Sequence, residues 1–367
     1  MSSPAFSNNC APAFEAQSKV FLITLDQDYT MQKTFILWCL CLLGTSVVVG
    51  QNDYRPTYPL EIGIQAGTAH YLGDLGGVGR PGYAPSSPEF QRGIGQGFVI
   101  DTDIESTRPT VGLFARWNFN GNFSARLDLN YLQLSGDDKY AGRNDLNFSP
   151  TQSRDGVNAA WFRYYRNLNF RSHVFDASIA MEVTPYNFQF GRGRGSSVLA
   201  PYGFLGVGLF AFNPEGFYNG GWVELKPLST EGQGLVPGRA PYDLVQMNIP
   251  MGVGVKWIYD DTWSLALEVN YRLTFTDYLD DVSVDYVEDE SIFEANFDPT
   301  RAQIARDLAR RSDELDPSGV NSIVTAPGEQ RGDPADNDAY YTVTIRFSYY
   351  IDTYSLGGGR RYGCPVW

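Results

Sequence analysis

The residues best suited to chemistry are two histidines, His70 and His173. Neither stands in a recognisable Ser/His/Asp or Asp/His arrangement, so the sequence offers no activated nucleophile. Two histidines and a single cysteine in the mature chain also argue against a zinc site, which usually needs four nitrogen or sulfur ligands. We therefore predict that the protein is not an enzyme and holds no cofactor.

A second group of reactive residues is a run of carboxylates, in which Asp277, Asp280, Asp281 and Asp285 are candidate Ca²⁺ ligands. Calcium prefers hard oxygen ligands, but the run lacks the regular Asp-x-Asp-x-Asp-Gly spacing. The alternative is an ordinary solvated loop. Residues 276–338 hold 17 acidic and five basic side chains, so −12 of the net charge of −14 lies there. This concentration favours a surface that faces a partner or lipopolysaccharide, with divalent cations as bridges.

One glycine-rich stretch, Gly191-Arg192-Gly193-Arg194-Gly195, is predicted to form a basic turn. This stretch is no phosphate-binding loop, because it lacks the Lys-Ser/Thr pair and the strand-to-helix setting. Arg192 and Arg194 are candidate partner-binding residues, and a flexible linker is the alternative. The net charge of −14 argues against nucleic acid as a partner, since no basic patch could neutralise phosphates.

The elements that must position these residues are strands, and the clearest pair lies within Val245–Phe275. Apolar residues recur there at every second position on both sides of a short break at 259–262. Similar alternation predicts strands at 60–72, 110–118, 123–131, 175–183, 202–212 and 341–351. The connections alternate strictly between long (73–109, 135–167, 213–243, 276–338) and short (119–122, 185–199, 259–262). A short helix is expected at 300–315, with an apolar stripe of Ile304, Leu308 and Leu315.

This pattern predicts an all-β fold, an eight-stranded antiparallel up-and-down transmembrane β-barrel with long outer loops and short periplasmic turns. A soluble lipocalin-like barrel has the same period but an apolar interior. The polar positions here are rich in small residues and in charges of both signs, as expected for a narrow filled lumen. The predicted interior charges are Arg126, Lys256, Arg272 and Arg346 with Asp128, Asp176, Glu182 and Glu268.

The N-terminal region resembles an export signal. Residues 31–50 combine a short basic start, an apolar stretch and small residues before Gln51, which predicts a signal peptide cleaved after Gly50. Residues 1–30 are then an upstream extension from a wrong start site, and an uncleaved signal anchor is the alternative. The barrel occupies 51–354 and a periplasmic tail 355–367. Cys364 is the one cysteine that remains after cleavage. It is expected as a free thiol, and an intermolecular disulfide is the alternative. Cys364 is therefore a third candidate for partner binding.

Four segments resemble the PorG-like outer-membrane β-barrels of Bacteroidota. They are 135–138, 166–173, 227–234 and 274–283, and the string Thr276-Asp277-Tyr278-Leu279-Asp280-Asp281-Val282 is the most specific. The similarity runs from about residue 60 to about residue 354 and includes Cys364-Pro365, while 287–338 is longer than the family pattern. The resemblance implies a component of type IX secretion and gliding machinery that contacts a periplasmic ring.

We therefore expect an integral outer-membrane barrel that anchors or assists a type IX secretion machine. Its expected partners are outer-membrane lipid, lipopolysaccharide and a periplasmic secretion-ring or lipoprotein subunit. Two alternatives stay open: a receptor whose acidic outer loops hold a ligand or Ca²⁺, and a narrow channel.

Overall fold

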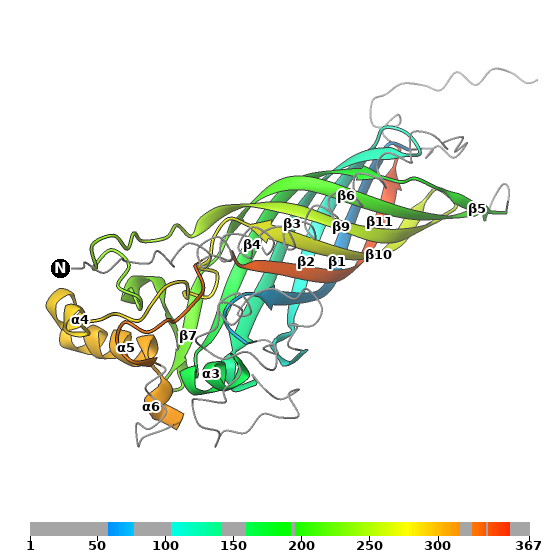
Figure 1. The fold of residues 1–367 in the computed structure, drawn as a ribbon. Helices are drawn as coiled ribbons and strands as arrows, with labels where there is room; N and C mark the ends of the chain where they lie inside the picture. The colour runs from blue at the N-terminus through cyan, green and yellow to red at the C-terminus, as the bar shows by residue number, and fades with distance from the viewer. Residues whose placement is uncertain are drawn as a thin grey trace, which may run out of the picture. The chain divides into compact units, whose positions relative to one another are not determined.

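Eight antiparallel strands close into a barrel in the computed structural model, which describes residues 58–76, 104–140, 159–191, 195–315, 325–334 and 337–352. The barrel strands are β1 (Leu60–Leu72), β2 (Arg108–Asn118), β3 (Phe123–Asp137), β4 (Asn169–Val183), β6 (Ser197–Ala211), β9 (Val245–Tyr259), β10 (Trp263–Thr274) and β11 (Ala339–Ile351). Each strand pairs with the next, and β1 pairs with β11 along its whole length (Figure 1). The predicted fold, a transmembrane up-and-down barrel, is confirmed.

The barrel strands are 11 to 15 residues long. A tilted strand needs about 9–11 residues to cross a membrane, so every one of them is long enough. Their outward side chains are exposed and apolar, among them Ile64, Leu113, Ile179, Val207 and Val253. Within the part of the chain that the structure describes, no helix is long and apolar enough to span a bilayer.

Several strands extend beyond their predicted bounds, and β3, β4 and β6 are the most extended. β6 begins at Ser197 rather than at Tyr202, and its first residues pair with a short extra strand, β5 (Phe188–Phe190). The link predicted at 185–199 is therefore largely a hairpin. β4 begins at Asn169, because its ladder with β3 continues outward until Asn169 pairs with Asp137.

Aromatic residues at inward positions blur the alternation in β6, and the structure shows how they fit. Phe204 and Phe210 point inward and are buried. A Cβ atom on Gly252 would lie 2.7 Å from the ring of Phe204, so the glycine makes room for it. The inward glycines of β9 thus let large rings enter a narrow lumen.

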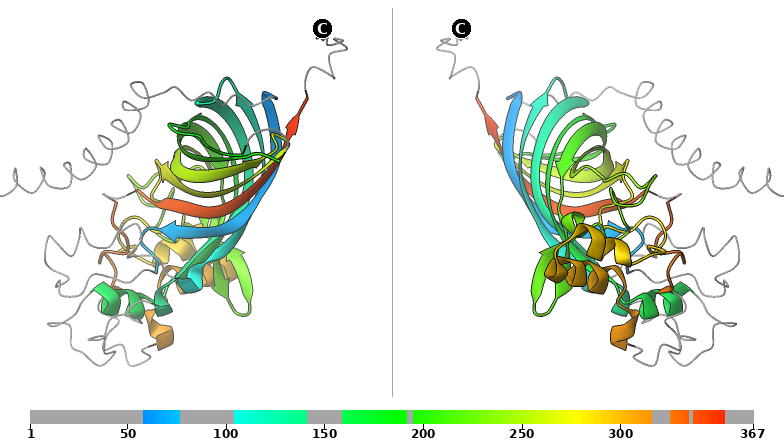
Figure 2. Two further views of the ribbon diagram at one scale, coloured as in Figure 1. Left: turned by 90° about the vertical axis from the view of Figure 1, so that its right-hand side faces the viewer. Right: turned by 90° about the vertical axis from the view of Figure 1, so that its left-hand side faces the viewer.

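The described parts of the long connections fold over one end of the barrel (Figure 2). They contain the helices α3 (Ala159–Arg166), α4 (Ser291–Asn296), α5 (Pro299–Ala309) and α6 (Ser312–Leu315) and the hairpin β7 (Pro214–Tyr218) and β8 (Gly221–Glu224). Short 3₁₀ turns lie at Ile104–Ser106, Asp138–Tyr140 and Lys226–Leu228. We call the described parts of these four connections the loop cap.

The helix predicted at 300–315 is present but broken. Asp298 caps α5 by accepting hydrogen bonds from the backbone N–H groups of Thr300 and Arg301. Arg310 then takes an extended conformation, which ends α5 and separates it from α6. Leu308 is buried as predicted, whereas Leu315 is 40% exposed and does not extend the apolar stripe.

Several predictions lie outside the described residues. They concern the upstream extension, the signal peptide, Arg192, Arg194 and the tail that contains Cys364.

Candidate functional site

The lumen of the barrel is filled by a lattice of ion pairs. Arg126 donates from Nη2 to Glu268 Oε1 at 3.0 Å, and its Nε lies 2.7 Å from Asp128 Oδ2. Arg346 donates to the same two carboxylates, at 2.7 Å to Asp128 Oδ1 and 2.8 Å to Glu268 Oε2. Glu268 also accepts from the hydroxyl of Tyr202 at 2.7 Å. Because every member has opposite charges around it, the lattice avoids an uncompensated buried charge.

The lattice includes one ion pair that the sequence prediction missed. Arg116 donates from Nη1 to Glu61 Oε1 at 2.7 Å and from Nε to Glu182 Oε2 at 3.1 Å. Lys256 lies 3.8 Å from the other oxygen of Glu61. Both missed residues stand on the polar parity of their strands, so the alternation itself could have identified them. The interior thus holds five basic and five acidic side chains.

A second layer of polar contacts lies toward the loop cap. Asp176 accepts from Arg272 Nη2 at 3.0 Å, from Asn130 Nδ2 at 3.0 Å and from Asn248 Nδ2 at 2.7 Å. The hydroxyl of the fully buried Tyr340 lies 3.5 Å from Asp176 Oδ2. All eight charges predicted for the interior are therefore buried in the lumen, in two layers of contacts.

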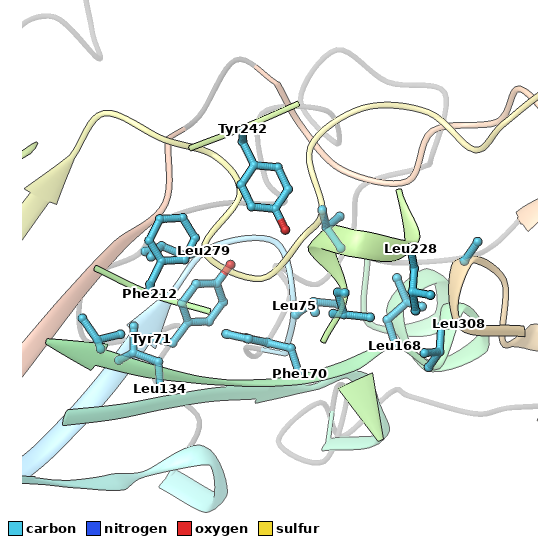
Figure 3. Packing of buried hydrophobic residues seen from close by; sticks show 14 of the residues in the cluster. Tyr71, Leu75, Leu134, Leu168, Phe170, Phe212, Leu228, Tyr242, Leu279 and Leu308 are labelled. Carbon is cyan, nitrogen blue, oxygen red and sulfur yellow. The ribbon is translucent and has the colours of Figure 1, made fainter. Parts of the chain in front are cut away.

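The loop cap has an apolar core that continues from the mouth of the barrel (Figure 3). Tyr71 and Phe170 pack edge-on with ring centroids 4.7 Å apart, and Phe212 stacks on Tyr242. Farther out, Leu228 and Leu308 join the third and fourth connections. Among the described residues, packed side chains cover the mouth of the barrel.

Arg166 connects three of the four connections. Its guanidinium donates to both oxygens of Asp138, at 2.8 and 2.9 Å, to the carbonyl of Asp74 at 2.6 Å and to the carbonyl of Arg331 at 2.7 Å. Asp138 also accepts from the backbone N–H groups of Gly76 and Leu168, at 3.1 Å each. Opposite charge at Asp138 holds the pKa of Arg166 above its ordinary value despite burial.

The third connection is joined to the fourth in a similar way. Glu231 accepts from Arg331 Nη1 at 2.9 Å and from the backbone N–H of Ser283 at 3.0 Å. Asp281 accepts from the hydroxyls of Tyr242 and Thr230. The four segments that carry the family resemblance supply Asp138, Arg166, Glu231 and Asp281, so they meet in the loop cap.

The carboxylates proposed as calcium ligands are not arranged as one site. Asp277, Asp280 and Asp281 are only 7%, 1% and 0% exposed, whereas Asp285 is exposed, so the expectation of a solvated loop is wrong for the first three. Asp280 accepts from Tyr71 while Asp281 accepts from Tyr242. Among the residues described, no group of three or more His, Cys, Asp or Glu side chains could hold a metal ion.

Burial changes the acidity of these loop carboxyls. It raises the pKa of Asp280 to about 7 and that of Asp281 to about 6. Burial together with the negative charges of Asp338 and Asp74 raises the pKa of Asp277 to about 11. The structure therefore concentrates carboxyls of raised pKa where the first and fourth connections meet.

The histidines occupy the outer part of the barrel wall. His70 stacks on Tyr341 with centroids 4.6 Å apart and lies 3.0 Å from the hydroxyl of Thr68. The ring nitrogen Nδ1 of His173 is 2.7 Å from the hydroxyl of Tyr131. Both positions are explained by contacts between neighbouring strands.

Comparison with known proteins gives structural neighbours only. No family model and no curated protein sequence matches the chain. The solved structures that resemble it include Ail, the attachment invasion locus protein of Yersinia pestis, in complex with the heparin analogue sucrose octasulfate. The match has 9% identity and a TM-score of 0.29, and covers 79% of this chain and 98% of Ail. Neisserial surface protein A matches with 7% identity and a TM-score of 0.29, over 79% of this chain and 97% of the other.

Proposed function

We propose that this integral outer-membrane barrel is a non-enzymatic anchor or accessory subunit of a type IX secretion-type machine. The observation that carries the proposal is the closed lumen. Charged side chains fill the barrel from Glu61 to Asp176, and Tyr71, Phe170 and Phe212 cover its mouth. A barrel closed in this way acts through its surfaces and not by passing a substrate.

The membrane is the outer membrane of a bacterium. Barrels with an even number of strands, long external connections and short periplasmic turns are typical of that membrane. The predicted signal peptide agrees with export to it. The outward apolar side chains face lipid, and the loop cap faces outside the cell.

The link to type IX secretion rests on the resemblance to PorG-like barrels. Its support is that the four resembling segments interlock through Arg166 and Arg331 rather than being scattered over the surface. In this proposal the barrel and loop cap form one rigid body, and the short periplasmic turns and the tail contact a ring or lipoprotein subunit.

The test is affinity purification of the full chain from cross-linked native membranes, combined with a deletion strain. We expect secretion-ring or lipoprotein subunits in the purified material and a defect in secretion of cargo proteins after deletion. Recovery of no secretion component, together with normal secretion in the deletion strain, would contradict the proposal.

A second candidate function is a receptor that uses the acidic exterior of the loop cap. Exposed carboxylates lie along its outer surface, namely Asp285, Glu288, Asp289, Glu294, Asp298, Asp313, Glu314 and Glu329. Divalent cations could bridge them to the phosphates of lipopolysaccharide. Calorimetry of the refolded barrel with Ca²⁺, with and without lipopolysaccharide, distinguishes the two functions, because the anchor hypothesis requires no heat of binding.

The third hypothesis, a narrow channel, is tested by conductance in planar bilayers. Because side chains fill the lumen, we expect no steady conductance. A reproducible ion-selective conductance of the intact protein would favour the channel over the anchor.

A further inference from the structure

One hydroxyl at the end of β1 lies between two buried carboxyl groups of the fourth connection. Tyr71 Oη is 2.7 Å from Asp280 Oδ2 and 2.6 Å from Asp338 Oδ1. Both distances are those of hydrogen bonds between oxygens. A tyrosine hydroxyl has one hydrogen, so it can donate to only one of the two carboxyls.

The other oxygen of each carboxyl already has a donor. Asp280 Oδ1 accepts from the N–H of Val282 at 2.9 Å, and Asp338 Oδ2 accepts from the N–H of Leu279 at 2.8 Å. The hydroxyl also accepts from the N–H of Asp74 at 3.1 Å. This leaves one lone pair on Tyr71 Oη and one short oxygen–oxygen contact without a hydrogen. One additional proton on a carboxyl would supply the missing hydrogen for this contact and would donate it to the remaining lone pair of Tyr71 Oη.

We infer that Tyr71, Asp280 and Asp338 bind one shared proton, and that this proton latches the fourth connection onto the end of β1 at the mouth of the barrel. The protonated carboxyl donates to Tyr71 Oη, and the hydroxyl donates to the other carboxylate. Each oxygen in the chain then has a hydrogen-bond partner. Loss of the proton would leave two ionised carboxylates competing for one hydrogen in a buried site.

The surrounding charges agree with a bound proton. Asp277 lies in the same cluster, and neither of its buried oxygens has a hydrogen-bonding partner. Asp74 adds a fourth carboxyl and accepts from the N–H of Asp333 at 2.9 Å. The positive groups that face the cluster are Arg163 and Arg166 from α3 and Arg331 from the fourth connection. The other nearby carboxyl groups are those of Asp138, Glu231, Asp281 and Asp333. The nearby phenol groups are those of Tyr242, Tyr278 and Tyr286. Arg166 and Arg331 are paired with Asp138 and Glu231, so they do not neutralise all four clustered carboxyls.

The direction of the pH dependence follows from linkage. Burial raises the pKa of Asp280 and Asp338 in the closed cap, whereas an open cap would return them toward their ordinary value of 3.8. The closed state therefore retains protons that the open state has released. Closure is strongest in acid and weakens as the pH rises through the raised pKa of about 7 for Asp280.

The experiment measures opening of the cap in the full chain, refolded into vesicles, by hydrogen exchange of residues 276–283 between pH 5 and pH 9. We expect the opening constant, corrected for intrinsic exchange, to rise about tenfold per pH unit for the one retained proton below its pKa in the closed cap, and to level off above that pKa. Asp338→Asn places an amide nitrogen where the protonated oxygen lies. This variant should remain closed. The logarithm of its opening constant should rise with pH by about one unit less per pH unit than in the wild type. The exposed Glu329→Gln should keep the slope of the wild type.

Equal slopes in the wild type and in Asp338→Asn would overturn the proposal, as would a wild-type cap whose opening does not change with pH. If Asp338→Asn does not refold, infrared spectroscopy of the wild type decides. A protonated carboxyl band that persists at pH 6 and is absent from Tyr71→Phe supports the shared proton, and its absence from the wild type contradicts it. Ca²⁺ that protects the cap at high pH and removes the pH dependence would show a cation site instead.

Discussion

Arg166 and Asp138 form a two-point ion pair in the loop cap, with N–O distances of 2.8 and 2.9 Å and both side chains 0% exposed. The same guanidinium binds the carbonyls of Asp74 and Arg331, so one side chain holds parts of three connections. A flat, forked donor is needed for these four contacts, and a lysine cannot supply them. The cap is thus held by one buried arginine and its carboxylate more than by surface charges.

Arg166→Ala should therefore open the loop cap while the barrel remains folded. Removing one partner of a buried ion pair costs about 3–5 kcal/mol, because Asp138 is left charged and unpaired. Limited proteolysis of the vesicle-embedded protein should show faster cleavage of 213–243 and 276–315. Arg306→Ala is the matched control, since the Arg306–Glu294 pair is largely exposed and worth at most about 1 kcal/mol. Equal sensitivity of the two variants would count against the central role of Arg166.

Glu268→Ala should destabilise the barrel itself. The substitution removes the carboxylate shared by Arg126 and Arg346, and two buried guanidinium groups lose a partner. We expect the free energy of unfolding in urea to fall by about 3–5 kcal/mol. Leu267→Ala is a suitable control, because Leu267 is the next residue on the strand and is 56% exposed on the lipid side. A similar loss in both variants would argue against an energetic role for the interior lattice.

Val253→Arg tests the assignment of the outward face to lipid. Val253 is in the middle of β9 and is 60% exposed. An arginine near the bilayer midplane of a barrel costs about 2–4 kcal/mol. Unfolding measured in vesicles should show this loss, while Glu294→Arg on the loop cap should leave the free energy of unfolding nearly unchanged. A tolerated Val253→Arg would mean that this face meets water.

Two glycines of the wall should differ in their tolerance of a methyl group. A Cβ on Gly254 would lie 2.5 Å from the ring of Tyr202, whereas a Cβ on Gly203 would meet only the carbonyl oxygen of Gly252 at 3.7 Å. Gly254→Ala should lower the free energy of unfolding by about 1–3 kcal/mol through overpacking, and Gly203→Ala should have little effect. The comparison is made by urea unfolding of both variants in the same vesicles. If Gly254→Ala were as stable as Gly203→Ala, the lumen would be looser than the structure indicates.

Alternation of apolar and polar residues determined the barrel from the sequence alone. In a strand, successive side chains face opposite sides, so Val253 and Lys256 were assigned to lipid and lumen without knowledge of any partner. The same rule placed eight of the ten interior charges. It would also have placed Glu61 and Arg116, which stand at polar positions of β1 and β2.

Only the tertiary structure showed that the long connections pack together into the loop cap. Outside the helix predicted at 300–315, residues 213–243 and 276–338 show no periodic pattern, and the many acidic side chains of 276–338 suggested a solvated surface. The cap forms because Arg166, Arg331 and Tyr71 reach across 28 to 267 residues of sequence to their partners. Local sequence does not specify contacts of that separation, since they depend on how the closed barrel brings the ends of β1, β3, β4 and β11 together. For that reason Asp280 and Asp281, whose carboxylates suggested calcium from the local composition, proved to be buried hydrogen-bonding groups at the mouth of the barrel.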